Sequence, residues 1–437
     1  MTAPRRVPPE APARRGWCPS LARPMPTGDG LLARIHPLLG RLTPGQTRAV
    51  AEGARRFGNG HIDVTARANL QVRGVGEATR CGLADHLAAV GLGDVRHDGG
   101  PQRLTLTTPL AGLESKNPIA VVALAETIEA AGLAVPGLPA KTLVAIEEAS
   151  PHTLLGAAEA DLHLVVTAEG LTLHPAGDAG WWRVAEADAP RVVDGALRML
   201  AASGRRRIRD LDDGHFASFA EAFGLVPAPP MLDAPRLRPG LFPLQSGRVA
   251  LLVDAPFGRC TAESLDVVAD AAETLGPEAL RLSPTRGLLL VAPGPAAAGA
   301  VRAALDEAGF LTRADDPRGA VAACPGAPAC ASGSTPTLRD AARLAGLLRP
   351  FAARGLRAHV SGCAKGCAHP GAADLTLVGR DGAYDVVLNG RPDALPATRL
   401  PFEAVLDRVR RADSALPLDR ALSDPAFHEP APGPRTS

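Results

Sequence analysis

Four cysteines in the C-terminal half of the chain form two close pairs. Cys324 and Cys330 enclose five residues in C-P-G-A-P-A-C, and Cys363 and Cys367 enclose three in S-G-C-A-K-G-C-A-H-P. Two such pairs, brought together in space, supply the four thiolates that a [4Fe–4S] cluster requires. The prolines and glycines within and beside the pairs favour tight loops, in which backbone N–H groups can approach the cluster sulfurs. The spacing therefore predicts an iron–sulfur cluster held by these four cysteines.

Zinc and disulfides are the other common uses of paired cysteines. Cysteine pairs that bind structural zinc usually enclose two to four residues, and the five-residue gap fits that poorly. Disulfides need an oxidising compartment, and the N-terminal M-T-A-P-R-R-V-P-P-E has no apolar signal core. Cys81 and Cys260 have no neighbouring cysteine and are expected to be packing residues. The role of Cys18, in W-C-P-S, stays open.

The composition restricts the class of protein. The chain has 437 residues, enough for two to four domains, and 46% of them are hydrophobic. A net charge of +1 argues against nucleic acid or an anionic membrane surface as a partner. Every apolar stretch of membrane-spanning length is interrupted by proline, glycine or charge. We expect an enzyme of the cytoplasm.

The order of motifs in the N-terminal half recurs in the C-terminal half. P-M-P-T-G-D-G and L-L-A-R-I resemble P-L-Q-S-G and V-A-L-L-V, and G-R-L-T matches G-R-C-T. Three further patterns follow in each copy: an Ala-rich helix, a strand that ends with an arginine, and a second helix. They lie at 49–57, 62–67 and 80–90 in the first copy, and at 265–275, 280–286 and 295–308 in the second. This order predicts a ferredoxin-like α+β unit in each half.

The repeat continues beyond these units. P-L-A-G at 109–112 precedes a helical pattern at 119–131, as C-P-G at 324–326 precedes one at 338–347. L-P-A-K at 138–141 is paired with G-C-A-K at 362–365, each followed by a strand. We expect a duplicated architecture with a cluster in the second copy alone.

These patterns predict six segments. They are a disordered arm (1–16), the ferredoxin-like unit of repeat 1 (17–100), its α+β unit without a cluster (101–225), the ferredoxin-like unit of repeat 2 (235–315), the [4Fe–4S]-binding α+β unit (316–424) and a disordered tail (425–437).

A duplicated chain with these two cysteine spacings resembles the sulfite and nitrite reductase superfamily, in which the fourth cysteine bridges the cluster to the iron of a sirohaem. By position that residue is Cys367. Within the superfamily the chain is most similar to the precorrin-3B synthases, in R-P-M-P-T-G-D-G-L-L-A-R from Arg23, T-P-L-A-G-L from Thr108 and H-V-S-G-C-A-K-G-C-A-H-P from His359. Lys365 favours the synthases, because the reductases typically carry asparagine there. The resemblance implies an α+β fold of two ferredoxin-like half-units and two α+β cofactor-binding units.

The resemblance also implies an anion-binding set. The reductases use two arginines and two lysines. The arginines match Arg67, in T-x-R-x-x-x-Q, and Arg103, ahead of a proline. The first lysine matches Lys141, after L-P, and Leu143 replaces the second. With Lys365, the first three are the implied catalytic residues. The missing lysine counts against a sulfite reductase. Further candidate partners for substrate carboxylates are Arg73, Arg281 and Arg286.

The implied reaction joins precorrin-3A, O2 and a reductant, hydroxylates the macrocycle and closes a lactone in cobalamin biosynthesis. The cluster would pass electrons to a second iron, either in sirohaem or in a mononuclear non-haem site near His359 and His369. These two possibilities stay open. Because no G-x-G-x-x-G follows a strand, electrons are expected from NADH through a separate electron-transfer protein. The alternatives are a sirohaem-dependent sulfite or nitrite reductase and a plain electron carrier.

Overall fold

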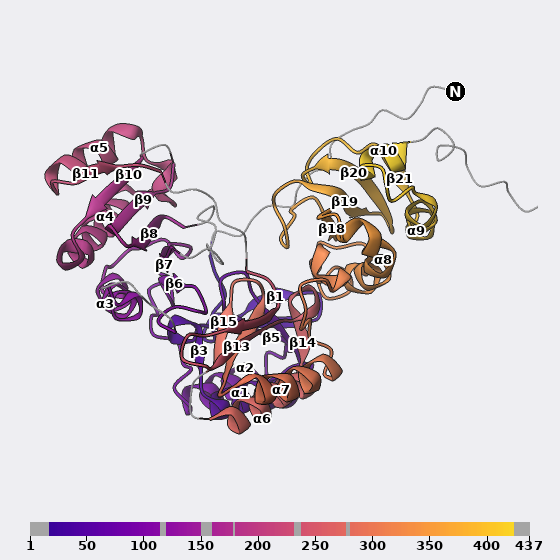
Figure 1. Cartoon of the computed structure of the whole chain (residues 1–437), viewed down its shortest axis with the longest axis horizontal. Helices are drawn as coiled ribbons and strands as arrows, with labels where there is room; N and C mark the ends of the chain where they lie inside the picture. Colours follow the sequence, from indigo (N-terminus) through magenta and orange to yellow (C-terminus); the bar gives the residue numbers. More distant parts are fainter. Residues whose placement is uncertain are drawn as a thin grey trace, which may run out of the picture. The chain divides into compact units, whose positions relative to one another are not determined.

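The computed structural model describes residues 17–113, 119–149, 160–177, 180–230, 237–276 and 280–423 (Figure 1). The chain forms two compact units. The N-terminal unit comprises Arg15–Pro26 and Leu31–Arg313, and the C-terminal unit comprises Ala314–Ser437 together with the turn Thr27–Gly30. The expected arm at 1–16 lies outside the described residues, as does the expected tail at 425–437.

Two similar five-stranded sheets with two helices each confirm the ferredoxin-like unit predicted for each repeat. The first sheet has the order β1 (Met25–Thr27), β2 (Gly30–Ile35), β5 (Leu70–Val75), β4 (His61–Val64), β14 (Arg259–Thr261), with helices α1 (Pro44–Phe57) and α2 (Arg80–Ala88). The second has the order β12 (Gly240–Pro243), β13 (Val249–Asp254), β16 (Gly287–Ala292), β15 (Leu280–Ser283), β3 (Arg41–Leu42), with helices α6 (Ala262–Leu275) and α7 (Pro295–Glu307).

The two repeats exchange one short strand each. β14 of the second repeat pairs with β4 of the first, with Cys260 opposite Ile62, and β3 of the first pairs with β15 of the second, with Leu42 opposite Leu280. Each exchanged strand leads into a helix that begins with a threonine cap, Thr43 before α1 and Thr261 before α6. One of the two edge strands of each sheet therefore comes from the other repeat.

A single hydrophobic core joins the two repeats. Helix α1 packs against α6, and buried side chains from both copies belong to one cluster that includes Leu42, Ile62, Val64, Leu265, Leu280 and Leu282. Burial of this apolar surface stabilises the association of the two sheets.

A third sheet completes the N-terminal unit and has a counterpart in the C-terminal unit. The third sheet has the order β11 (Val226–Ala228), β10 (Trp181–Val184), β9 (Gly170–Pro175), β8 (Leu162–Thr167), β7 (Val144–Glu148), β6 (Thr105–Thr107), with α3 (Val121–Leu133), α4 (Ala189–Ser203) and α5 (Asp213–Ala222). The C-terminal sheet has the order β17 (Val321–Ala323), β18 (Ala358–Ser361), β19 (Ala373–Arg380), β20 (Ala383–Gly390), β21 (Thr398–Leu400), with α8 (Thr337–Ala352), α9 (Phe402–Arg411) and α10 (Leu418–Ser423). In each, the first three strands in chain order are parallel.

The register of these two sheets corrects one expected pairing. The Leu143 amide donates to Asp161 Oδ2 at 3.0 Å just before β7, and the Arg357 amide donates to Asp374 Oδ2 at 2.7 Å just before β18. These matching contacts make β7 the counterpart of β18. L-P-A-K precedes β7 whereas G-C-A-K follows β18, so pairing these two stretches was wrong. P-L-A-G and C-P-G both follow the first strand of their sheet and, as expected, both precede a helix, α3 and α8 respectively.

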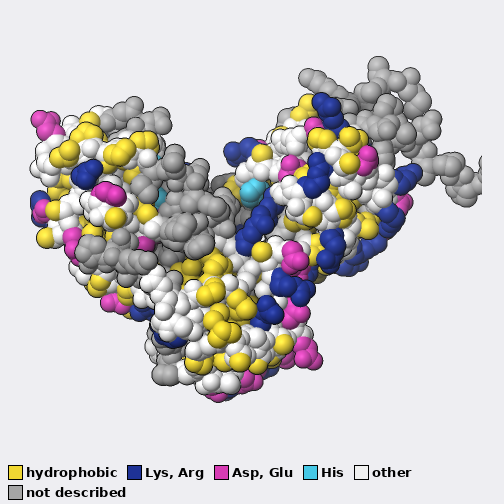
Figure 2. All heavy atoms as spheres, in the orientation of Figure 1, with side chains coloured by type: hydrophobic (Ala, Val, Ile, Leu, Met, Phe, Trp, Pro, Cys, Tyr) yellow, Lys and Arg dark blue, Asp and Glu magenta, His cyan; other side chains and the backbone are white. Residues whose placement is uncertain are grey.

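The surface carries both signs of charge. Figure 2 shows Lys and Arg side chains on the visible face of the C-terminal unit, interspersed with acidic ones. Several pair with a neighbouring carboxylate, as Arg343 does with Glu403 at 2.6 Å and Arg318 with Asp316 at 2.7 Å. Among the described residues, no helix combines the length and hydropathy needed to cross a membrane.

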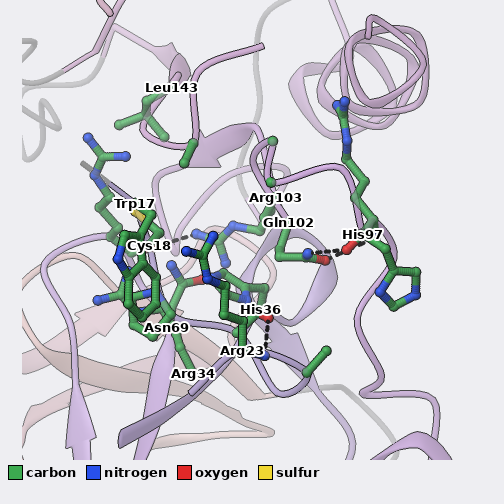
Figure 3. Close-up of a pocket in the computed structure, with 18 residues that line it drawn as sticks. Trp17, Cys18, Arg23, Arg34, His36, Asn69, His97, Gln102, Arg103 and Leu143 are labelled. Atoms are coloured by element: carbon green, nitrogen blue, oxygen red, sulfur yellow. Dashed lines mark hydrogen bonds between the residues drawn. The ribbon is translucent and has the colours of Figure 1, made fainter. Parts of the chain in front are cut away.

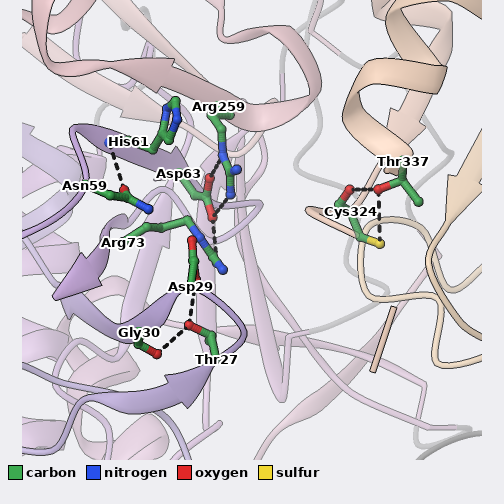
Figure 4. Close-up of polar contacts among 10 residues, drawn as sticks. All are labelled: Thr27, Asp29, Gly30, Asn59, His61, Asp63, Arg73, Arg259, Cys324 and Thr337. Atoms are coloured by element: carbon green, nitrogen blue, oxygen red, sulfur yellow. Dashed lines mark hydrogen bonds and ion pairs between the residues drawn. The ribbon is translucent and has the colours of Figure 1, made fainter. Parts of the chain in front are cut away.

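An ion triad sits where β14 joins the first sheet (Figure 4). Asp63 on β4 is the register partner of Arg259 on β14 and accepts from its Nε at 2.6 Å and its Nη2 at 3.1 Å. Arg73 Nη1 adds a contact of 3.3 Å to the same carboxylate and is only 2% exposed. One carboxylate thus bridges two guanidinium groups at the strand exchange.

Replacing Asp63 by alanine should destabilise the fold by about 3 kcal/mol, because two largely buried guanidinium groups lose their counter-charge. The free energy of unfolding in urea measures this. Asp270→Ala, which removes an exposed partner of Arg48, is the matched control and should change stability little. Equal effects of the two substitutions would contradict the importance of the triad.

Candidate functional site

The four cysteines belong to two loops at one edge of the C-terminal sheet. Cys324 directly follows β17, and Cys363 lies two residues after β18. β17 and β18 are adjacent and parallel, so the loops that follow them meet at the same edge. The topology therefore brings the two predicted pairs together.

Glycines shape both loops. Gly326 has φ +62°, a left-handed conformation that favours glycine, and its carbonyl accepts from the Cys330 amide at 2.7 Å. The Gly362 amide donates to Cys324 Sγ at 3.1 Å. A Cβ at position 362 would lie 3.2 Å from the Cα atoms of both Gly326 and Gly333, tighter than an ordinary contact. An N–H group pointed at a cysteine sulfur is the environment that a bound iron–sulfur cluster uses.

Thr337 and Lys365 interact with the cysteine loops. Thr337 donates its hydroxyl to the Cys324 carbonyl and lies 4.0 Å from Cys324 Sγ (Figure 4). Burial raises the pKa of the Cys363 thiol, and the nearby thiols Cys324 and Cys330 raise it further, while the Lys365 charge lowers it. Burial and the thiols of Cys324 and Cys363 raise the pKa of Cys367 to about 11. A bound cation would favour the thiolate forms of these cysteines.

The donor set of the two loops is four cysteine thiols. A [4Fe–4S] cluster spreads four thiolates around its faces and uses cysteines alone. His359 on β18 is fully buried, and its ring meets that of His369 edge-on, with centroids 5.8 Å apart.

The turn Thr27–Gly30 belongs to the same unit as the first cysteine loop. Thr27 Oγ1 donates to Asp29 Oδ1 and the Gly30 carbonyl, both at 2.8 Å. The Gly28 amide donates to the Ala329 carbonyl at 3.2 Å, and a Cβ at position 28 would lie 2.0 Å from the Pro328 carbonyl oxygen. Only glycine permits this approach, so the T-G-D-G turn supports the loop between Cys324 and Cys330.

A pocket of about 130 Å³ lies in the N-terminal unit (Figure 3). Its lining includes five arginines and two histidines, and no Asp or Glu is among the described lining residues: Arg23, Arg34, Arg67, Arg96, Arg103, His36 and His97. Trp17 and Cys18 lie on one side, and Leu143 supplies an apolar wall. Such a concentration of positive charge predicts an anionic ligand.

Strand β2 and the turn between β4 and β5 supply part of the pocket lining. Arg34 lies on β2; with the Gln71 amide oriented so that its oxygen faces Arg34, that oxygen accepts from Nη2 at 2.6 Å and Nε at 2.9 Å. The Arg23 guanidinium lies over the Trp17 ring, 4.4 Å from its centroid. Arg96 pairs with Asp98, which is outside the lining.

Burial and neighbouring positive charges lower the pKa values of several pocket residues. Burial lowers the pKa of Arg34, and the nearby Arg67 charge lowers it further, although Cys18 opposes the shift. Burial lowers the pKa of Arg103 to about 10. Burial and the charges of Arg34 and Arg103 hold the pKa of His36 well below its usual range, so His36 is neutral near pH 7. An incoming carboxylate would relieve the repulsion between the guanidinium groups.

Three of the four implied catalytic residues lie in the N-terminal unit. Arg67 and Arg103 both line the pocket, and Arg67 Nη1 donates to the Lys141 carbonyl at 2.9 Å. The Lys141 side chain is exposed and is not part of the lining. Lys365 lies between the cysteines of the C-terminal unit. Their roles remain predictions.

Two of the other candidate arginines serve the fold instead. Arg73 belongs to the ion triad with Asp63. Arg281 Nη1 donates to the carbonyls of Pro109 at 3.0 Å and Ala111 at 2.7 Å, which fixes the P-L-A-G turn. The sequence analysis missed Arg34 and His36 as pocket residues. The signal was present, because R-P-M-P-T-G-D-G-L-L-A-R begins with Arg23 and ends with Arg34.

Comparisons with known proteins agree with this architecture. Residues 23–90 match the nitrite/sulfite reductase ferredoxin-like half domain. The solved structure of the Mycobacterium tuberculosis NirA protein superposes with a TM-score of 0.67 over 87% of this chain and 80% of that chain, at 21% identity, which establishes the fold.

Two relatives match along most of the sequence. A ferredoxin–nitrite reductase from Synechococcus elongatus is 27% identical over 435 residues, covering 86% of this chain and 83% of that protein. A precorrin-3B synthase from Sinorhizobium sp. is 33% identical over 404 residues, covering 89% of this chain and 85% of that protein. Taken with the duplicated fold, the paired cysteine loops and the arginine-lined pocket, this similarity shows that the chain belongs to the precorrin-3B synthase family of the sulfite/nitrite reductase superfamily.

Proposed function

We propose that this oxidoreductase hydroxylates precorrin-3A with O2 and forms the lactone of precorrin-3B. The single observation that carries the proposal is the arginine-lined pocket without a lining carboxylate, in a chain similar over most of its length to a precorrin-3B synthase. The substrate is a macrocycle with several carboxylate arms. Guanidinium groups recognise such arms through paired hydrogen bonds.

The size of the pocket limits what enters it. A volume of about 130 Å³ accommodates carboxylate arms rather than a whole tetrapyrrole. Arg34 and Arg67 would bind these arms. Leu143, which is 5% exposed and takes the place of a lysine of the reductase pattern, would give the ligand an apolar wall. A site with this wall and fewer cations suits a large organic anion better than sulfite or nitrite.

Cys324, Cys330, Cys363 and Cys367 would hold a [4Fe–4S] cluster, which when bound supplies electrons one at a time. The Gly362 amide would remain hydrogen-bonded to the Cys324 sulfur, and Lys365 would favour the thiolates by its charge. A second iron centre, in sirohaem or in a non-haem site, and electrons from NADH through a separate electron-transfer protein complete the proposal.

The contact of Gly28 with the first cysteine loop can be tested through cluster content. Gly28→Ala should displace the loop, because the new methyl group would overlap the Pro328 carbonyl, and should reduce bound iron to roughly half or less. Iron and acid-labile sulfide per chain, with the EPR spectrum of the reduced protein, measure this. Gly346→Ala is the matched control, since a Cβ there meets open space on α8. Equal iron content in both variants would refute the support that the turn is proposed to give.

The role of Arg34 can be tested through ligand affinity. Arg34→Gln should weaken binding of uroporphyrin III, a stable polycarboxylated tetrapyrrole, by about tenfold, because a charged hydrogen bond to a carboxylate is lost. Titration of the protein with the porphyrin, followed by fluorescence, gives the affinity. Arg48→Gln on the exposed face of α1 is the control and should bind as the unaltered protein does. Arg34 is not a ligand if the two variants bind equally.

The reaction itself is tested with isotopically labelled O2. The protein, purified without oxygen and carrying its cluster, is given precorrin-3A, a chemical reductant and labelled O2, and the product is weighed. Incorporation of one labelled oxygen atom is expected. An unchanged tetrapyrrole, despite an intact cluster, would overturn the proposal, and turnover of sulfite or nitrite by the same preparation would then favour a reductase.

A further inference from the structure

The turn that carries Arg67 has a counterpart in the second repeat. Ile35 on β2 is opposite Leu70, and Val253 on β13 is opposite Leu288, so Ala68 corresponds to Arg286. Both residues have left-handed backbone, with φ of 50° and 74°. The amide of each donates to the carbonyl three residues earlier, at 2.9 Å and 3.1 Å. The two turns therefore have the same backbone conformation.

The segments that face these turns also correspond. A short 3-10 helix follows β2 in the first repeat (Leu38–Gly40) and β13 in the second (Pro256–Gly258). Gly40 donates to the Pro37 carbonyl at 2.9 Å, and Gly258 donates to the Ala255 carbonyl at 2.8 Å. Pro37 is thus the counterpart of Ala255.

One hydrogen bond differs between the repeats. In the second repeat the Ala255 amide donates to the Arg286 carbonyl at 3.1 Å and ties the turn to the facing segment. Pro37 has no N–H and cannot make this bond to the Ala68 carbonyl. Arg103 Nη1 occupies this role instead, donating to the Ala68 carbonyl at 2.8 Å and to the Pro37 carbonyl at 3.1 Å. A buried carbonyl left without a donor would be costly.

The same guanidinium holds the backbone of Arg67. Arg103 Nη2 donates to the Arg67 carbonyl, so most of its N–H donors go to three backbone oxygens. Arg103 is 7% exposed, whereas Arg67 is half-buried and sends Nη1 to the Lys141 carbonyl. We propose that Arg103 is a positioning residue: it replaces the hydrogen bond that Pro37 cannot make, and so fixes the turn that presents Arg67 to the ligand. The ligand part of this inference rests on the proposed function.

The difference between Pro37 and its counterpart Ala255 provides a test of this proposal. Arg103→Ala should loosen the Thr65–Asn69 turn and weaken uroporphyrin III binding by about tenfold. Pro37→Ala restores the backbone N–H that the second repeat has at Ala255. The double variant Pro37→Ala/Arg103→Ala should therefore recover most of the lost affinity, while Pro37→Ala alone should resemble the unaltered protein. Porphyrin titration and hydrogen exchange of peptides covering Thr65–Asn69 are measured on all four full-length proteins.

Rescue by the second substitution distinguishes positioning from direct binding. If Arg103 contacts the ligand itself, the affinity lost in Arg103→Ala is not recovered in the double variant, exchange of the turn is unchanged, and the proposal is overturned. If Arg103→Ala does not fold, folding of the double variant counts as rescue, and failure of both overturns the proposal. Hydrogen exchange decides the matter even if no variant binds the porphyrin, a result that would count against the proposed function instead.

Discussion

The reciprocal strand exchange between the two repeats is the constraint on which the N-terminal unit depends. β14 completes the sheet of the first repeat and β3 that of the second, and both strands are only two or three residues long. Strands of this length cannot hold their place through backbone hydrogen bonds alone. The packing of α1 against α6 supports both strands from outside the sheets, and the triad around Asp63 adds side-chain contacts between β14 and its neighbours within the first sheet. Because Arg34 and the turn of Arg67 belong to β2 and to the β4–β5 connection, the pocket inherits its geometry from this interlocked pair.

The two copies of the scaffold serve different ends. In the first repeat, His36 and Arg67 line the pocket. The corresponding positions in the second repeat hold Asp254 and Thr285, whose hydroxyl donates to the Asp254 carboxylate. Burial raises the pKa of Asp254 to about 7. One copy thus carries an electropositive pocket, whereas two of the equivalent positions in the other hold a carboxylate and a hydroxyl that bond to each other. The third sheet and the C-terminal sheet also differ in this way, since only the loops of the C-terminal sheet carry the paired cysteines.

Local patterns made much of this predictable from the sequence. Helices and strands of each repeat, and the meeting of the cysteine pairs, follow from periodicity, spacing and the order of motifs. The exchange of β3 and β14 was not predictable, because strands so short carry no periodic signal. Nor could the sequence distinguish Arg34, which lines the pocket, from Arg73, which is buried, because both lie on strands. The partner of Arg73 is Asp63, whose carboxylate also binds Arg259 of the other repeat. The mistaken pairing of L-P-A-K with G-C-A-K arose because similar letters occurred on opposite sides of equivalent strands.

The contact of Gly28 with the loop at Pro328 bears on the timing of maturation. The turn is made early during synthesis, whereas the loop that it supports emerges after nearly all of both repeats, and contacts between such distant segments form late in folding. The turn therefore lacks this contact until residues 324–330 have been synthesised. A chain interrupted before Cys324 would contain the turn but neither the loop that it contacts nor the four paired cysteines.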